Sequence, residues 1–289
     1  MEWTIWVADG TQGLFTLDAQ GVRQISCALL WPHAPCPGGH SFFCACKKRG
    51  VVQRFSPSGD SWAAEAEFPA PPGLECMQSS PDGGKLYLLS GEADSLLTIS
   101  ATTGEMLYGN AAGVYPRSVQ VDATGTLCAV AGGAAGEILL YQTPSLKLVR
   151  RITVPGIACQ AVFCSNGLAI LCAIENGEVD TVLGFVGPSR KTMEEVYRLP
   201  GLPGALAALP DGTLLVGSVG SLARISLHPK KAVWRSSSFG LPSTLSVLGN
   251  EVLVSDPLLG RVIQMNWQRP REQHILLKGG EMAAVWQGI

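Results

Sequence analysis

Charged side chains are scarce in this chain. Asp, Glu, Lys and Arg make up only 15% of its 289 residues, against roughly 25% in an average globular domain. Helical bundles and coiled coils need long charged outer faces, and disordered chains have little apolar content, so this low charge and an apolar share of 46% exclude all three. The formal net charge is −2, which leaves no basic excess to bind phosphates or anionic lipids. We therefore expect no nucleic-acid partner and no membrane partner.

Long hydrophobic runs are missing as well. The longest, Leu168 to Ile174, has seven residues, whereas a membrane span needs roughly 18. Glu2 and Asp9 take the place of the basic start of a secretory signal. The nine cysteines are an odd set scattered singly, and no Asn-x-Ser/Thr sequence occurs. We expect reduced, buried thiols in a cytoplasmic, monomeric protein, with a secreted protein as the alternative if a leader has been lost.

Glycine, in contrast, is plentiful and regularly placed. Gly83, Gly125, Gly167 and Gly212 each close a turn between two apolar stretches, and they follow one another at intervals of 42, 42 and 45 residues. In most units a third and a fourth short apolar stretch follow the second. Four strands of about five residues, repeated about every 41 residues along the chain, are typical of the blades of a β-propeller.

The sequence therefore predicts an all-β, seven-bladed β-propeller of four-stranded antiparallel blades in a single domain, residues 1–289. The first unit lacks its innermost strand, and Met282 to Trp286 is predicted to supply it and so to close the ring without unpaired edges. Lys191 to Leu199 has near-helical apolar spacing but is predicted to be the outermost strand of unit five. The predicted blades are 2–24 with 281–286, 25–67, 73–109, 115–153, 157–199, 203–236 and 242–278.

Two of these units resemble a known repeat. The run from Tyr115 to Leu127, with the sequence YPRSVQVDATGTL, and the run from Ser80 to Leu88, with the sequence SPDGGKLYL, resemble the YVTN-type β-propeller repeat. The resemblance implies a seven-bladed ring of the kind found in YncE-like proteins and, more distantly, in the seven-bladed lactonases. It is specific in units three and four, moderate in five to seven and slight in one and two. The chain has neither WD-type repeats nor the Trp-docking repeats of quinone-dependent dehydrogenases, so no quinone and no other cofactor is implied.

One short segment concentrates metal-ligand residue types: His33, Cys36, His40, Cys44 and Cys46. Phe42 to Cys46 reads as a strand, which would place His40 and Cys44 about 13 Å apart, too far for one tetrahedral ion. A loop set of His33, Cys36 and His40 stays open. We expect Cys44 and Cys46 to fill space between blades, and we predict no metal site.

A nucleophilic triad lacks support. Only four histidines occur, and His228 and His274 are expected at the outer rim. No Gly-x-Ser-x-Gly sequence is present, and the glycine-rich run Gly132 to Gly136 reads as a hairpin turn between two strands rather than a phosphate loop.

The innermost strands of a propeller begin around a central channel, which makes their first residues candidates for a ligand site. Aligned on the turns, Arg117 is equivalent to Glu75 in the preceding unit. A guanidinium at this ring can hold a carboxylate or phosphate, and the carboxylates can act as acid or base. The alternative is that Arg117 pairs with Glu75 and plugs the channel. The other equivalent positions are Cys159, Gly204, Ser243 and Glu281.

We predict a non-enzymatic binding propeller with a polar channel mouth for a small anionic ligand or a peptide. A lactone hydrolase is the first alternative, with Arg117 holding the substrate and Glu75 or Glu281 as general base. A protein-interaction scaffold is the second, if Trp62, Trp234 and Trp267 lie exposed on the outer rim instead of filling the blades.

Overall fold

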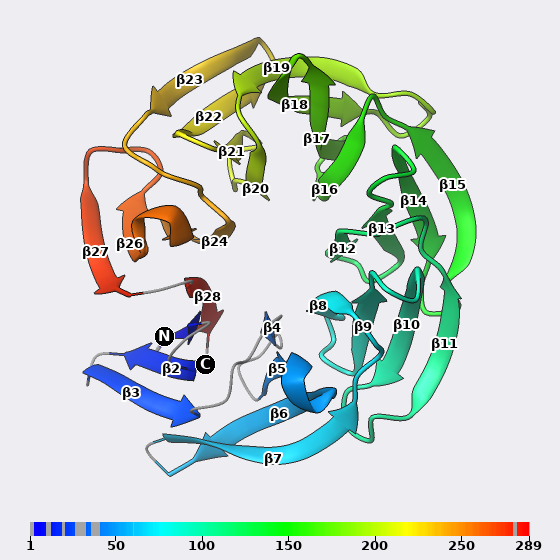
Figure 1. Ribbon diagram of the computed structural model, residues 1–289, viewed down its shortest axis with the longest axis vertical. Coiled ribbons are helices and arrows are strands. Elements are labelled where there is room, and N and C mark those ends of the chain that lie inside the picture. The colour runs from blue at the N-terminus through cyan, green and yellow to red at the C-terminus, as the bar shows by residue number, and fades with distance from the viewer. Residues whose placement is uncertain are drawn as a thin grey trace.

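In the computed structural model the described residues are 3–9, 13–18, 21–26, 33–35, 41–59, 61–279 and 282–288, with only the backbone described at 3, 33–35 and 282–288. They form seven four-stranded antiparallel sheets arranged as blades of a ring (Figure 1). The predicted fold class is confirmed.

We number the blades in chain order and give their strands from the innermost outward. Blade 1 contains β28 (Met282–Gly288), β1 (Trp3–Asp9), β2 (Gly13–Asp18) and β3 (Gly21–Ser26). Blade 2 contains β4 (His33–Pro35), β5 (Phe42–Cys46), β6 (Val51–Ser58) and β7 (Ser61–Pro69). Blade 3 contains β8 (Leu74–Ser79), β9 (Lys85–Ser90), β10 (Ser95–Ser100) and β11 (Met106–Ala111). Blade 4 contains β12 (Ser118–Val121), β13 (Leu127–Ala131), β14 (Glu137–Gln142) and β15 (Lys147–Thr153).

The remaining three blades follow the same order. Blade 5 contains β16 (Ile157–Cys164), β17 (Gly167–Asn176), β18 (Glu178–Val186) and β19 (Glu194–Pro200). Blade 6 contains β20 (Pro203–Ala208), β21 (Leu214–Ser218), β22 (Ser221–Leu227) and β23 (Lys230–Ser236). Blade 7 contains β24 (Thr244–Leu248), β25 (Glu251–Asp256), β26 (Arg261–Asn266) and β27 (Gln273–Lys278). The described helices are the short 3-10 helices η1 (Lys47–Arg49) and η2 (Pro257–Leu259), and neither is long or apolar enough to cross a membrane.

Two predictions about individual strands are confirmed. β28 pairs antiparallel with β1 over seven residues, from Trp3 opposite Gly288 to Asp9 opposite Met282, so a late strand completes the first blade. The segment with helical spacing in unit five forms β19, which pairs with β18 as the outermost strand.

The hydrophobic core of the described residues is divided among the contacts between blades. Seven buried clusters occur, and each joins one blade to the next around the ring, the seventh bringing Leu253 and Val262 of blade 7 against Ile5 and Val7 of blade 1. Because both faces of each sheet are covered, the strands carry few charges, which accounts for the low charged fraction of the sequence.

Two cysteines and three tryptophans are part of this packing. Cys44 and Cys46 are buried between blades 1 and 2, as predicted, and burial raises the pKa of Cys44 well above its usual value. Trp267 is 2% exposed in the cluster between blades 6 and 7, and Trp234 packs against that cluster. Trp62 packs against the cluster between blades 1 and 2, so all three tryptophans fill space between blades. The scaffold hypothesis loses the exposed tryptophans on which it relied.

The ring has two unlike faces. The innermost strands begin at one face, here called the mouth face, which also carries the turns between second and third strands. They end at the other, the turn face, in the Asp-Gly turns seen in the sequence. In blade 3, for example, the N–H of Gly83 donates to the carbonyl of Ser80 at 2.9 Å, and Gly83 adopts a φ of +70° that glycine accommodates at no steric cost.

Candidate functional site

The described members of the predicted ring lie where the innermost strands begin. Glu75 and Cys159 are the residues skipped in the strand register of β8 and β16, so each sits in a β-bulge. A similar irregularity covers Gly204 in β20. Bulges change the direction of a side chain and terminate regular pairing, and they are common beside functional sites. Arg117 and Ser243 instead immediately precede β12 and β24, and their N–H groups donate to Ala131 and Ser255, each at 2.9 Å.

Two of the predicted residues share one pocket. Glu75 and Arg117, from neighbouring blades 3 and 4, line a cavity of about 390 Å³ at the mouth face. Its other charged side chains are Glu92 and Asp94, from the turn between β9 and β10. We call this cavity the mouth pocket, and its full lining is Gly73, Glu75, Gly91, Glu92, Asp94, Tyr115, Pro116 and Arg117.

Glycines make room for the acidic side chains of the mouth pocket. A Cβ added to Gly91 would lie 2.7 Å from Cγ of Glu75, and one added to Gly73 would lie 2.5 Å from Cβ of Glu92. Real Cβ atoms do not approach other carbon atoms so closely. These two glycines therefore allow both carboxylates to occupy the pocket.

The wall of the mouth pocket contains unusual backbone conformations. Asp94 and Tyr115 have φ values of +47° and +49°, and only one other described non-glycine residue, Leu146, has a positive φ. The N–H of Tyr115 donates to Oδ1 of Asp94 at 2.8 Å, which ties the two loops together. Such conformations cost about 1–3 kcal/mol each and concentrate at functional sites. The Tyr115 side chain, 65% exposed, stands beside Arg117 at the rim.

The charges of the mouth pocket are available to a ligand. Within the described part of the chain, the side chains of Glu75, Glu92 and Arg117 form no hydrogen bond or ion pair. The described residues therefore lack the Arg117–Glu75 ion pair that the channel-plugging alternative requires. Three carboxylates and one guanidinium, partly exposed around one cavity, form a polar site with an excess of negative charge.

The other predicted ring residues are placed differently. Burial raises the pKa of the half-buried Cys159 thiol, although a hydrogen bond from Ala173 and the nearby Arg117 guanidinium lower it, so the thiol stays protonated near neutral pH and is a poor nucleophile. Ser243 donates a long hydrogen bond of 3.4 Å to the carbonyl of Ser255. Neither residue lines the mouth pocket. Glu281 lies outside the described residues.

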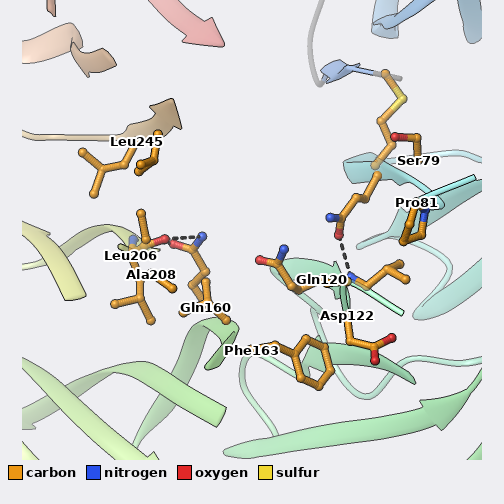
Figure 2. Close-up of a pocket in the computed structure, with 16 residues that line it drawn as sticks. Ser79, Pro81, Gln120, Asp122, Gln160, Phe163, Leu206, Ala208 and Leu245 are labelled. Atoms are coloured by element: carbon orange, nitrogen blue, oxygen red, sulfur yellow. Dashed lines mark hydrogen bonds between the residues drawn. The ribbon is translucent and has the colours of Figure 1, made fainter. Parts of the chain in front are cut away.

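A second, larger cavity was not predicted. It occupies about 610 Å³ toward the turn face and is bounded by β8, β12, β16, β20 and β24, the innermost strands of blades 3 to 7 (Figure 2). Gln78, Gln120 and Gln160 project from three consecutive strands of its wall. The sequence held a signal for this cavity, because Gln78 and Gln120 both stand five residues before the glycine of their turn.

No metal centre is found among the residues whose side chains are described, since no group of three His, Cys, Asp or Glu residues could hold an ion there. The loop hypothesis of His33, Cys36 and His40 is untested, because the His33 side chain and the other two residues lie outside the description. His228 and His274 are exposed on outer elements of blades 6 and 7, as predicted. The Gly132 to Gly136 run forms the hairpin between β13 and β14, also as predicted.

Comparison with known proteins identifies the fold and nothing finer. No protein-family model and no curated protein matches the chain. The periplasmic gluconolactonase of Pseudomonas aeruginosa is 13% identical over all of both chains, with a TM-score of 0.73. A putative 6-phosphogluconolactonase from Bacteroides fragilis is 12% identical over 100% of this chain and 98% of its own, with a TM-score of 0.70. A functionally unknown protein from Desulfotomaculum acetoxidans is 10% identical over 99% of both chains, with a TM-score of 0.78. These structures are alike in fold along their whole lengths, so the chain is a seven-bladed propeller with lactonase-like neighbours.

Proposed function

We propose that this protein is a non-enzymatic binding propeller whose mouth pocket holds a small hydroxylated acid. The observation that carries the proposal is the group of unpaired charges that line that pocket: Arg117, Glu75 and Glu92. A guanidinium binds a carboxylate through two parallel hydrogen bonds. The carboxylates accept hydrogen bonds from hydroxyl groups, which anions such as chloride, nitrate and sulfate do not have.

The charge balance of the mouth pocket favours a hydroxylated acid over an anion that has no hydroxyl groups. Three carboxylates against one guanidinium repel a ligand that offers only negative charge. A hydroxylated acid satisfies both signs, because its carboxylate meets Arg117 and its hydroxyl groups donate to Glu75 and Glu92. The exposed ring of Tyr115 at the rim supplies an apolar face on which a small ligand can pack.

Calorimetry with gluconate as the probe tests this proposal. We expect saturable binding that weakens at least tenfold in Arg117→Ala, because about 1.5–3 kcal/mol is the usual contribution of a hydrogen-bonded charge. Arg235→Ala, which removes an exposed arginine from outer strand β23, is the matched control and should bind like the parent. A parent that binds neither gluconate nor any other small hydroxylated acid, or an Arg117→Ala variant that binds as the parent does, would refute it.

A lactone hydrolase is the second candidate, favoured by the presence of a carboxylate and a guanidinium in one pocket and by the similarity in fold to two proteins described as gluconolactonases. In this reaction Glu75 takes a proton from water, and the resulting hydroxide attacks the lactone carbonyl, whose developing oxyanion Arg117 stabilises. The carbonyl to ring-oxygen bond then breaks, and the proton passes from Glu75 to the departing alkoxide, which gives a hydroxy acid.

Turnover separates the two candidates. Release of acid from glucono-δ-lactone above the spontaneous rate, abolished in both Arg117→Ala and Glu75→Ala, would establish the hydrolase. Gluconate binding without any acceleration of hydrolysis would establish the binding protein.

We also propose a cytoplasmic location. The seven cysteines that the structure describes are all free, which is typical of a reducing compartment. Cell fractionation tests the location directly, and recovery of the protein outside the cytoplasm would contradict it.

A further inference from the structure

We infer that the larger cavity is a second binding site, for an uncharged planar heterocycle that carries a hydrogen-bond donor beside an acceptor, such as a free nucleobase or a lactam. We call this cavity the glutamine cavity. It lies at the opposite end of the innermost strands from the mouth pocket, and its volume of about 610 Å³ is suited to a small organic ligand. The inference goes beyond the proposed function, because no residue lines both cavities.

Two of the three glutamines have structural partners. Oε1 of Gln78 in β8 accepts a hydrogen bond of 2.7 Å from the N–H of Val121 in β12. The Gln160 amide in β16 binds Leu206 in β20 at both ends, accepting from its N–H at 2.8 Å and donating to its carbonyl at 3.2 Å. These side chains join the innermost strands of neighbouring blades, whose inner edges have no further strand to pair with.

Gln120 lies between these two glutamines and does not link neighbouring strands. It lies in β12, the strand between β8, which carries Gln78, and β16, which carries Gln160. Its amide points into the glutamine cavity without a hydrogen bond to any described residue (Figure 2). A primary amide presents an acceptor and a donor side by side in one plane. This arrangement binds a matching donor and acceptor pair in two parallel hydrogen bonds, as glutamine does with the edge of adenine.

The remaining wall suits an uncharged ligand. Asp122 is the one ionisable residue among those that line the cavity. Its Oδ1 already accepts from the N–H groups of Thr126 and Leu127, both at 2.8 Å. A buried charge on the ligand would have no partner and would lose its hydration. Leu206, Leu245 and Val247 supply apolar surface, and Phe163 offers an aromatic ring against which a planar heterocycle can stack.

The probes are free adenine and free uracil, with adenosine monophosphate as the charged comparison, and binding is measured by calorimetry on the full chain. We expect at least one free base to bind with a stoichiometry of one and the nucleotide to bind more weakly. Gln120→Ala and Gln120→Leu should each weaken base binding about tenfold, because a paired amide contributes about 1–3 kcal/mol of discrimination. Gln142→Ala, which removes an exposed amide at the end of β14, is the matched control and should bind like the parent.

Several results would overturn the inference: no measurable binding of either base at millimolar concentration, equal binding by the Gln120 variants and the parent, or tighter binding of the nucleotide. Arg117→Ala distinguishes this site from the mouth pocket. It should leave base binding unchanged, and weaker base binding in that variant would place the base at the mouth and refute the second site. Failure of gluconate to bind would leave the result with adenine and uracil unaffected.

Discussion

The carboxylates of the Asp-Gly turns and those of Glu75 and Glu92 in the mouth pocket differ in what they contact. At the turn face the carboxylates hold turns: Asp82 accepts from the N–H of Gly84 at 3.0 Å, and Asp211 accepts from that of Thr213 at 3.0 Å and pairs with Arg224. At the mouth face Glu75 and Glu92 have no such partner within the described chain. The chain therefore has acids of both kinds, and Glu75 and Glu92 of the mouth pocket are free to contact a ligand.

This contrast depends on a closed ring, so the largest effect is expected from opening it. Deleting residues 281–289 removes β28 and leaves β1 without its seven paired residues. The exposed edge and the unpacked faces of blades 1 and 7 should give an aggregating chain without a cooperative unfolding transition. Thermal unfolding and size-exclusion chromatography measure this. A monomeric truncated protein with the melting temperature of the parent would show that closure by β28 is not required.

The next largest effect is expected from a substitution that displaces one loop of the mouth pocket. In Gly133→Ala the new Cβ would lie 1.8 Å from the carbonyl oxygen of Tyr115, at a φ of +44°. The Tyr115 loop must then move, and we expect a loss of about 2–3 kcal/mol in the free energy of unfolding, together with the loss of ligand binding at the mouth.

Gly212→Ala is the matched control at the turn face. Its φ is +81°, but an added Cβ would meet nothing within 4 Å. We expect a cost of about 1–2 kcal/mol from the backbone conformation alone, and no change at the mouth. Urea unfolding of both variants measures the difference, and equal costs would show that the packing of Tyr115 on Gly133 does not constrain the mouth.

The fold could be predicted from sequence because its signal is repeated. The turns at Gly83 and Gly125 recur with the same spacing, and alternating apolar stretches between them leave few other architectures. That alignment also brought together Glu75 and Arg117, which line one pocket between blades 3 and 4. The positive φ values of Asp94 and Tyr115, however, depend on contacts between loops of different blades, which no local pattern encodes. The glutamine cavity was not predicted, because glutamine is uncharged and common in structural roles. Which of the three amides has a partner depends on contacts between blades.

Acid should destabilise one of the turns at the turn face. Burial raises the pKa of Asp122, but the hydrogen bonds from Leu127, Thr124 and Thr126 outweigh it and hold the pKa below the ordinary 3.8. A carboxyl whose pKa is lower in the folded state stabilises the fold at pH values above its unfolded pKa, and this contribution is lost as the pH falls through the folded pKa. We therefore expect Asp122→Ala to be about 1.5 kcal/mol less stable than the parent at pH 7, with the difference disappearing below pH 3.8.

The control for this pH dependence is Glu178→Ala, which removes an exposed carboxylate at the mouth face. Because this side chain is exposed on the surface, its removal should change the free energy of unfolding at pH 7 by less than about 0.5 kcal/mol. Urea unfolding between pH 2 and pH 7, roughly the range over which carboxyl groups titrate, provides the measurement. If the free energies of unfolding of Asp122→Ala and the parent differ by the same amount at every pH, the role assigned to the Asp122 carboxylate is contradicted.

The smallest expected effect separates two glutamines at the same repeat position. Gln78→Ala removes the acceptor for the N–H of Val121 and should lower the free energy of unfolding by about 1 kcal/mol. Gln120→Ala removes an amide that binds no described residue, so its stability should change by less than about 0.5 kcal/mol while its ligand affinity falls. Because the two substitutions are chemically identical and lie one blade apart, a stability loss confined to Gln78→Ala assigns the Gln78 amide to the fold and leaves the Gln120 amide for binding. Equal losses would mean that Gln120 also joins neighbouring blades, and the case for a second site would then fail at its central residue.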